Sequence, residues 1–104
     1  MSESPLPPEA CTSMAEVRAG VDALDAHLVD MLATRFAYMR AAARIKPERS
    51  QVRDEARKAQ VIANARARAE DLGLPAEAVG NLWHDLVEAS IGYELSEWNE
   101  RRKD

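Results

Sequence analysis

Apolar side chains in the first half of the chain recur at alternating steps of three and four residues. That spacing is the period of the buried stripe of an amphipathic helix. The stripe consists of Met14, Val17, Val21, Leu24, Leu28 and Met31. Ser13 followed by Glu16 fits a capping box at its start, and the next proline is Pro47. The pattern predicts one helix from about residue 14 to residue 46, roughly 45 Å long.

Two cations stand on this stripe, where further aliphatic side chains would be expected. Arg35 follows Leu28 by seven residues, and Lys46 follows Arg35 by eleven. At about 100° per residue, both lie within roughly 20° of Val17 around the helix. Cations on a buried face are costly unless an anion meets them. Arg35 and Lys46 are therefore the first candidate site residues.

A second, Ala-rich helix is expected after a short polar break at residues 47–51, which could act as a lid. This helix should begin near Val52 or Arg53 and end at Leu72, because Gly73 is a favourable residue just beyond a helix end. Its weak amphipathic pattern does not orient it.

The third predicted helix starts after Pro75 and reaches about Glu100. Its apolar stripe consists of Val79, Leu82, Trp83, Leu86 and Val87. Ser90 and Glu94 continue the same face, so a hydroxyl and a carboxyl one turn apart point to the side expected to be buried. Glu94 is the natural anionic counterpart of the two cations.

Composition agrees with an all-α protein of one domain. The chain has 104 residues, 46% of them hydrophobic and only 5% aromatic. Residues 1–12 are rich in proline and should form a flexible N-terminal tail, with residues 13–104 as the helical domain. The predicted order is long, medium, long. A helix of roughly 45 Å exceeds the radius of gyration of about 13 Å for such a chain, so we expect two protomers to intertwine as a homodimer.

Several classes of function are disfavoured. The formal net charge of −4 argues against a nucleic-acid binder. The single cysteine, Cys11, excludes an intrachain disulfide and has no nucleophilic constellation around it. His27 and His84 lack partners at ligand spacing, so no metal is expected. Without a signal peptide or a membrane-length apolar run, we expect a cytoplasmic protein.

Two interpretations of the inward charges remain at this stage. Arg35, Lys46 and Glu94 could be a structural ion-pair network in a non-catalytic helical dimer. Alternatively, they line a pocket for a small dicarboxylate, in which Arg grips one carboxylate bidentately and Lys acts as a point charge. Such a pocket can catalyse a reaction that needs mainly conformational restraint and electrostatic stabilisation.

An ordered set of short motifs resembles the all-helical class of chorismate mutases, close to its isochorismate pyruvate lyase subgroup. The motifs are Val17-Arg18, Asp22-Ala23-Leu24-Asp25, Ala33-Thr34-Arg35, Arg44-Ile45-Lys46, Val52-Arg53-Asp54 with Arg57, and Ser90 with Glu94. The resemblance implies an intertwined dimer of three-helix protomers and no cofactor. It also implies a substrate site in which Arg35, Lys46 and Arg57 bind the carboxylates and the ether oxygen. Arg18 would reach into the partner's site, the Asp54 backbone would contact the substrate hydroxyl, and Ser90 would form a polar wall.

Glu94 occupies a position where many members of that family have Gln, which hydrogen-bonds the ether oxygen as the C–O bond breaks. An ionised carboxylate would repel the developing negative charge, so Glu94 must be protonated to donate a hydrogen bond. We therefore expect activity to favour acidic pH. The neighbouring cations Lys46 and Arg35 oppose this effect by favouring the ionised form.

The favoured function is chorismate mutase, which converts chorismate to prephenate in aromatic amino acid biosynthesis by stabilising the diaxial conformer and the partly dissociated transition state. The alternative is isochorismate pyruvate lyase, which gives salicylate and pyruvate. Lys58 bears on the choice, because chorismate mutases often have at its position a Glu that holds the ring hydroxyl. The ends of the chain look closer to the lyase subgroup, whereas Val52-Arg53-Asp54 looks mutase-like.

Overall fold

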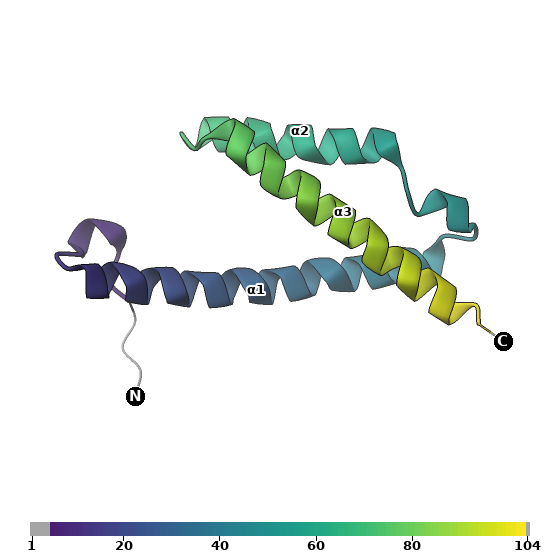
Figure 1. Cartoon of the computed structure of the whole chain (residues 1–104), viewed down its shortest axis with the longest axis horizontal. Coiled ribbons are helices and arrows are strands. Elements are labelled where there is room, and N and C mark those ends of the chain that lie inside the picture. Colours follow the sequence, from purple (N-terminus) through teal and green to yellow (C-terminus); the bar gives the residue numbers. More distant parts are fainter. Residues whose placement is uncertain (1–4, 104) are drawn as a thin grey trace. The chain divides into compact units, whose positions relative to one another are not determined.

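Every regular element of the described chain is helical. The computed structural model describes residues 5–103 (Figure 1). Along the chain lie a short 3₁₀ helix η1 (Pro8–Ala10), α1 (Met14–Ile45), a second 3₁₀ helix η2 (Arg49–Gln51), α2 (Glu55–Asp71) and α3 (Ala76–Arg101). The three α-helices contain 32, 17 and 26 residues. This confirms the predicted three-helix protomer with its long, medium, long order.

The chain divides into two compact units within α1, between Arg35 and Phe36. The first unit contains η1 and the N-terminal part of α1. The second contains the end of α1 together with η2, α2 and α3. No helix in the described part of the chain has the length and apolar character needed to cross a membrane.

The N-terminus of α1 is closed by the predicted capping box. The Glu16 backbone N–H donates to Ser13 Oγ at 3.2 Å, and Glu16 Oε1 accepts from the backbone N–H groups of Ser13 and Thr12. These hydrogen bonds, that from the Thr12 backbone foremost, lower the pKa of Glu16. Within the predicted flexible tail, residues 8–10 form η1, and residues 1–4 lie outside the described part.

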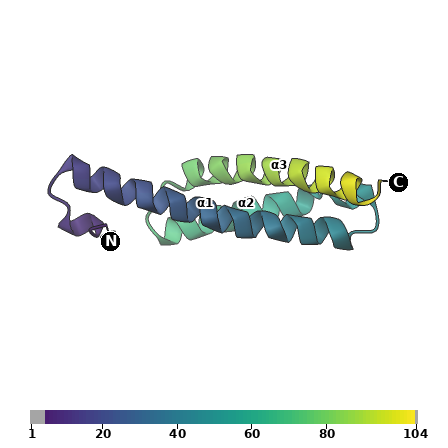
Figure 2. The same cartoon turned by 90° about the horizontal axis from the view of Figure 1, so that it is seen from below.

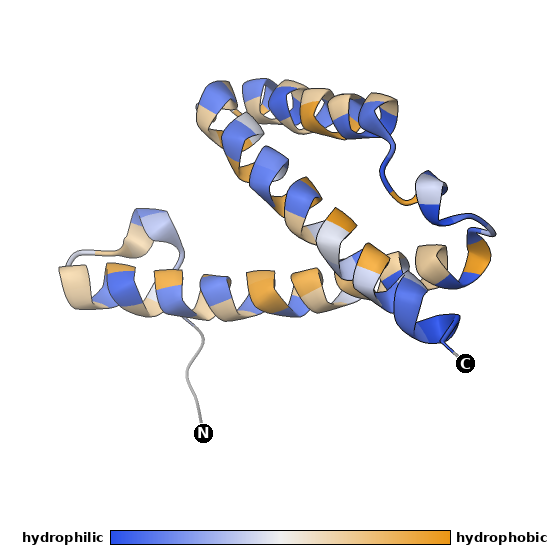
Figure 3. Ribbon diagram, turned by 45° about the vertical axis from the view of Figure 1, so that its right-hand side comes forward, coloured by the Kyte–Doolittle hydropathy of each residue, from blue (hydrophilic) through white to orange (hydrophobic). Residues whose placement is uncertain are grey.

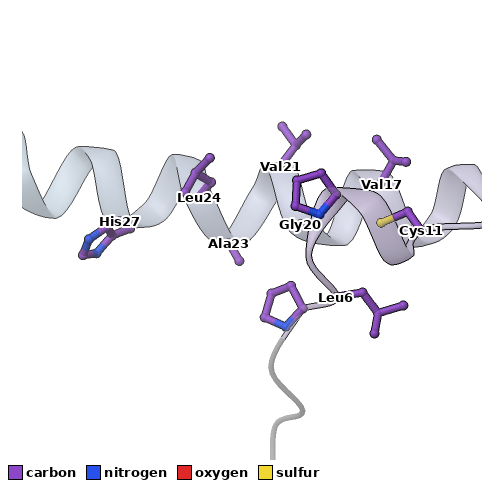
Figure 4. Close-up of a pocket in the computed structure, with 10 residues that line it drawn as sticks. Leu6, Cys11, Val17, Gly20, Val21, Ala23, Leu24 and His27 are labelled. Carbon is purple, nitrogen blue, oxygen red and sulfur yellow. The ribbon is translucent and has the colours of Figure 1, made fainter. Parts of the chain in front are cut away.

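The apolar stripe of the first unit is open to solvent in the single chain. Its exposed fractions run from 38% at Val17 to 61% at Leu24. Figure 3 shows hydrophobic and hydrophilic segments alternating along α1. In Figure 4, Val17, Val21 and Leu24 project from one side of the helix. Together with the N-terminal segment they border an apolar cleft of about 440 Å³, which Leu6 and Cys11 also line.

The second helix starts later than the sequence suggested. It begins at Glu55, not at residue 52 or 53, because Asp54 serves as its N-cap and accepts a hydrogen bond from the Arg57 backbone N–H at 3.0 Å. Val52 precedes the helix as a buried loop residue. The predicted end is confirmed: Gly73 has a φ of 72°, and the Leu74 N–H donates back to the Ala69 carbonyl at 2.8 Å.

The third helix buries a narrower line of residues than predicted. Its buried positions are Gly80, Val87, Ser90 and Glu94. The expectation for Leu82 is wrong, because this side chain is 64% exposed. It lies about 140° around the helix from Val87. Gly80 is the first of these buried positions, and the Arg66 side chain of α2 lies against it. A Cβ added at Gly80 would overlap the Arg66 side chain.

The end of α1 and the C-terminal half of α3 are neighbours in the second unit (Figure 2). The Phe36 and Tyr93 rings meet edge to face with centroids 5.0 Å apart. Arg40 Nη1 donates to the Tyr93 hydroxyl at 2.9 Å, an interaction that raises the pKa of Arg40. Lys46, at the end of α1, is thereby brought to the buried face of α3.

Candidate active site

A buried ion pair between α1 and α3 forms the centre of the site. Lys46 Nζ donates to Glu94 Oε2 at 2.7 Å. The Glu94 side chain is 6% exposed and that of Lys46 is 31% exposed, so the carboxylate is enclosed while the ammonium borders solvent. The predicted meeting of these two residues is confirmed. A buried pair of this kind requires good geometry to offset the loss of hydration of both charges.

Ser90 lies one turn before Glu94 on the same buried face of α3. It is 3% exposed, and its hydroxyl donates to the Leu86 carbonyl at 2.7 Å. A serine bonded in this way donates its hydroxyl proton back to the preceding turn of its own helix. The predicted burial of Ser90 on this face is confirmed.

The segment after Lys46 borders a surface cleft of about 580 Å³. Lys46 and Asp54 both line this cleft, with Pro47, Ser50 and Arg53 between them. Asp54 uses its carboxylate to cap α2, which fixes its backbone at the mouth of the cleft. The predicted lid therefore contains η2 and lies between two of the expected site residues.

Arg57, which the resemblance implies is a carboxylate ligand, lies in the first turn of α2. Its side chain is on the exposed side of α2, and its Nη1 donates to Gln60 Oε1 at 2.7 Å. Arg18 and Arg35 belong to the N-terminal unit, where Arg18 is exposed and Arg35 is half-buried. The structure thus brings together Lys46, Glu94 and, along the cleft, Asp54.

A second charged cluster, which the sequence did not reveal, connects the loop and α2 to α3. Arg53 binds Glu88 bidentately, with both distances near 3.0 Å, and Lys58 Nζ lies 2.6 Å from Glu88 Oε2. Arg53, followed by Lys58, lowers the pKa of Glu88 to about 2. Glu88 in turn raises the pKa of Arg53. Lys58 is thus paired through its ammonium with a carboxylate from the opposing helix.

No group of three or more potential ligands in the described residues is arranged to hold a metal ion. The paired side chains described so far are three cations and two carboxylates, with Ser90 one turn before Glu94. Such a site can bind an anion by exchanging one of its internal partners for a carboxylate of the ligand. Its chemical resources are electrostatic attraction and hydrogen bonding.

Comparison with known proteins identifies the family. The chorismate mutase type II family profile matches residues 17–95, which include Lys46, Ser90 and Glu94. The chain belongs to this family. It is also 30% identical to an isochorismate pyruvate lyase of Pseudomonas aeruginosa (strain PAO1) over 95 residues, which cover 91% of this chain and 94% of the relative. Both residues of the Lys46–Glu94 ion pair lie within the region that matches the chorismate mutase type II family.

Proposed function

We propose that the protein is a chorismate mutase that rearranges chorismate to prephenate. The observation that carries the proposal is the Lys46–Glu94 pair beside Ser90, inside the region that matches the family. Chorismate has two carboxylates and an ether oxygen, and prephenate is its isomer, so the reaction needs neither a second reactant nor a redox step. A cationic, partly enclosed site that favours the compact conformer of this dianion would be sufficient.

In the proposed mechanism, substrate replaces Glu94 as the partner of Lys46. The ammonium, with Arg35 and Arg57, holds the carboxylates and the ether oxygen. Glu94, once protonated, donates a hydrogen bond to the ether oxygen as the C–O bond breaks. Ser90 contributes a polar wall, and the Asp54 backbone receives the substrate hydroxyl. The buried setting of Glu94 supports this role, because a hydrogen bond counts for more where water is excluded.

A second candidate reaction is the elimination of pyruvate from isochorismate to give salicylate. The name of the Pseudomonas aeruginosa relative favours it. So does Lys58, which presents an ammonium paired with Glu88 where a mutase would often present a carboxylate to the ring hydroxyl. The atoms of isochorismate divide completely between salicylate and pyruvate, so this reaction also needs no further reactant.

The proposal includes a homodimer in which Arg18 enters the partner's site. Six apolar residues of α1 that form one helical stripe are between 38% and 61% exposed in the single chain. Leaving such a stripe in water would forfeit about 25 cal/mol for each Å² of apolar surface. A second copy of α1 presents the same stripe and is the simplest cover for it.

The experiment that tests this proposal is a paired assay of the purified protein with chorismate and isochorismate, from acidic to neutral pH. Dominant prephenate from chorismate supports the mutase. Dominant salicylate and pyruvate from isochorismate would replace it with the lyase and direct attention to Lys58. Folded protein without either activity would leave the Lys46–Glu94 pair as a structural link in a non-catalytic dimer.

A further inference from the structure

Three side chains at the C-terminal end of α3, the last of them from its C-cap residue Arg102, all bond to Lys46. Glu94, Trp98 and Arg102 are spaced four residues apart, so they share one face of the helix. Glu94 accepts from Lys46 Nζ at 2.7 Å. The other two bind the opposite end of the same residue: Trp98 Nε1 donates to the Lys46 carbonyl at 2.9 Å, and Arg102 Nη2 donates to it at 2.7 Å.

Pro47 explains why α1 needs donors from another helix. In an α-helix the carbonyl of residue 43 would accept from the N–H of residue 47, but proline has no N–H. Arg102 Nη1 takes its place and donates to the Ala43 carbonyl at 2.9 Å. Ala43 is 0% exposed, so its carbonyl without a partner would be costly. Arg102 thus donates to two of the carbonyls, those of Ala43 and Lys46, that the end of α1 leaves without a helical donor.

The two donors are also fixed relative to each other. The Arg102 guanidinium lies over the Trp98 ring, 4.2 Å from its centroid. Its positive charge sits at the C-terminus of α1, where the helix dipole is negative. This arrangement holds the Lys46 backbone firmly at a helix end that would otherwise fray into the loop.

We propose that Trp98 and Arg102 are positioning residues, which set the Lys46 ammonium in the active site by holding its backbone. The proposal rests on the proposed function for the role of the ammonium itself. Lysine has a flexible four-carbon stem, so its head is well placed only if its Cα is fixed. A displacement of about 1 Å in a pre-organised site can cost about 100-fold in rate, which makes the position of this backbone important for catalysis.

Trp98 and Arg102 together form a clamp on the Lys46 backbone, and two variants test it by each removing part of it. Trp98→Phe keeps the ring under Arg102 and removes only the N–H donor, whereas Arg102→Met removes both guanidinium donors. Arg101→Met is the matched control, because it deletes the same charge one residue earlier from a side chain that pairs with Glu97 at 3.6 Å. We expect each clamp variant to lower kcat by about 10-fold with little change in KM. The control should retain the parent rate.

A double-mutant cycle separates positioning from general stability. In the Lys46→Met background, Trp98→Phe and Arg102→Met should have no further effect on the residual rate, because the group they position is gone. An equal loss in both backgrounds, or an equal loss in Arg101→Met, would overturn the proposal.

Hydrogen exchange of the Lys46 amide provides a readout that does not depend on the reaction. This amide donates to the Ala42 carbonyl at 2.9 Å in the parent. Inactivity of the parent on both substrates would refute the proposed function alone. The clamp would still be supported by faster exchange in both clamp variants than in Arg101→Met, and overturned by parent-like exchange in both.

Discussion

Among residues 5–103, Glu94 is the charged residue that the fold buries, at 4% exposure. Its carboxylate contacts the Lys46 ammonium in the substrate-free protein. This contact is expected both for an ion pair with a purely structural role and for a catalytic site without bound substrate. The two roles differ in what happens when the pair is removed as a unit, because a structural pair contributes to stability whereas a catalytic pair contributes to turnover.

Lys46→Met should abolish most of the activity, by about 100-fold to 1000-fold, because it removes the cation that stabilises developing charge. It should also destabilise the fold by up to about 3 kcal/mol, because Glu94 is left buried without its partner. The double variant Lys46→Met/Glu94→Leu should recover the stability but not the activity. Turnover and urea unfolding of the parent, the single variant and the double variant test this, and activity surviving in the double variant would contradict the catalytic role.

Glu94→Gln should change the pH–rate profile. Gln donates a hydrogen bond at any pH, whereas Glu94 must first be protonated to do so. We expect kcat of the parent to rise toward acidic pH and that of the variant to stay level over the same range. Initial rates in a constant-ionic-strength buffer series provide the measurement. Parallel profiles for parent and variant would show that Glu94 does not donate to the ether oxygen.

The residues that the sequence made visible are those that break a periodic pattern. Lys46 and Glu94 were found because each interrupts an apolar stripe. Arg53, Lys58 and Glu88 interrupt no stripe, and 30 or more residues separate Glu88 from the other two, so only the tertiary structure reveals their cluster. Arg102 was equally hidden among terminal charges, although Pro47 signals that a carbonyl in the last turn of α1 lacks its usual donor.

At the level of elements, Glu88 joins the loop after α1 to α3. It binds Arg53, just after η2, and Lys58, in the first turns of α2. Nearby, Arg49 Nε donates to Asn99 Oδ1 at 3.3 Å, a second contact from η2 to α3. The segment between α1 and α2 is therefore linked to α3 at Arg49, within the predicted lid, and at Arg53, just after it.

Glu88→Gln should destabilise the protein at neutral pH in a salt-sensitive way. Because the pKa of Glu88 is lowered to about 2 in the fold, from about 4.3 in an unfolded chain, its stabilising effect is complete above the unfolded value. It is lost as pH falls toward 2. Unfolding curves of parent and variant should therefore differ at neutral pH and converge at the acidic end. A difference that stays constant with pH would assign the effect to packing instead.

The boundaries of the elements were predicted where local chemistry sets them. Ser13 with Glu16 and Gly73 fixed two helix ends correctly, because caps act within a few residues. Asp54 was not recognised as the N-cap of α2, so that helix was expected to start too early. Leu82 was assigned to the buried face because periodicity shows an apolar arc but not where the edge of that arc lies.

For the whole molecule, the exposed stripe of α1 leads to a test of how sites are shared. If Arg18 serves the partner's site, Arg18→Met and Lys46→Met should each be inactive alone. Refolding them together in equal amounts should restore about a quarter of the parent activity, since half of the dimers are mixed and each of those has one intact site of two. If Arg18 acts in its own chain, no mixed dimer has a complete site and activity stays absent.

The Trp98 clamp gives this protein an optical reporter of its own. The chain has two tryptophans, Trp83 and Trp98, and only the indole of Trp98 bonds to the Lys46 carbonyl among the described contacts. With Trp83 replaced by Phe, the emission of Trp98 would follow the surroundings of a single residue bonded to the Lys46 backbone. Stopped-flow fluorescence would then time the arrival of substrate separately from the chemical step, without a coupled assay and without an attached dye.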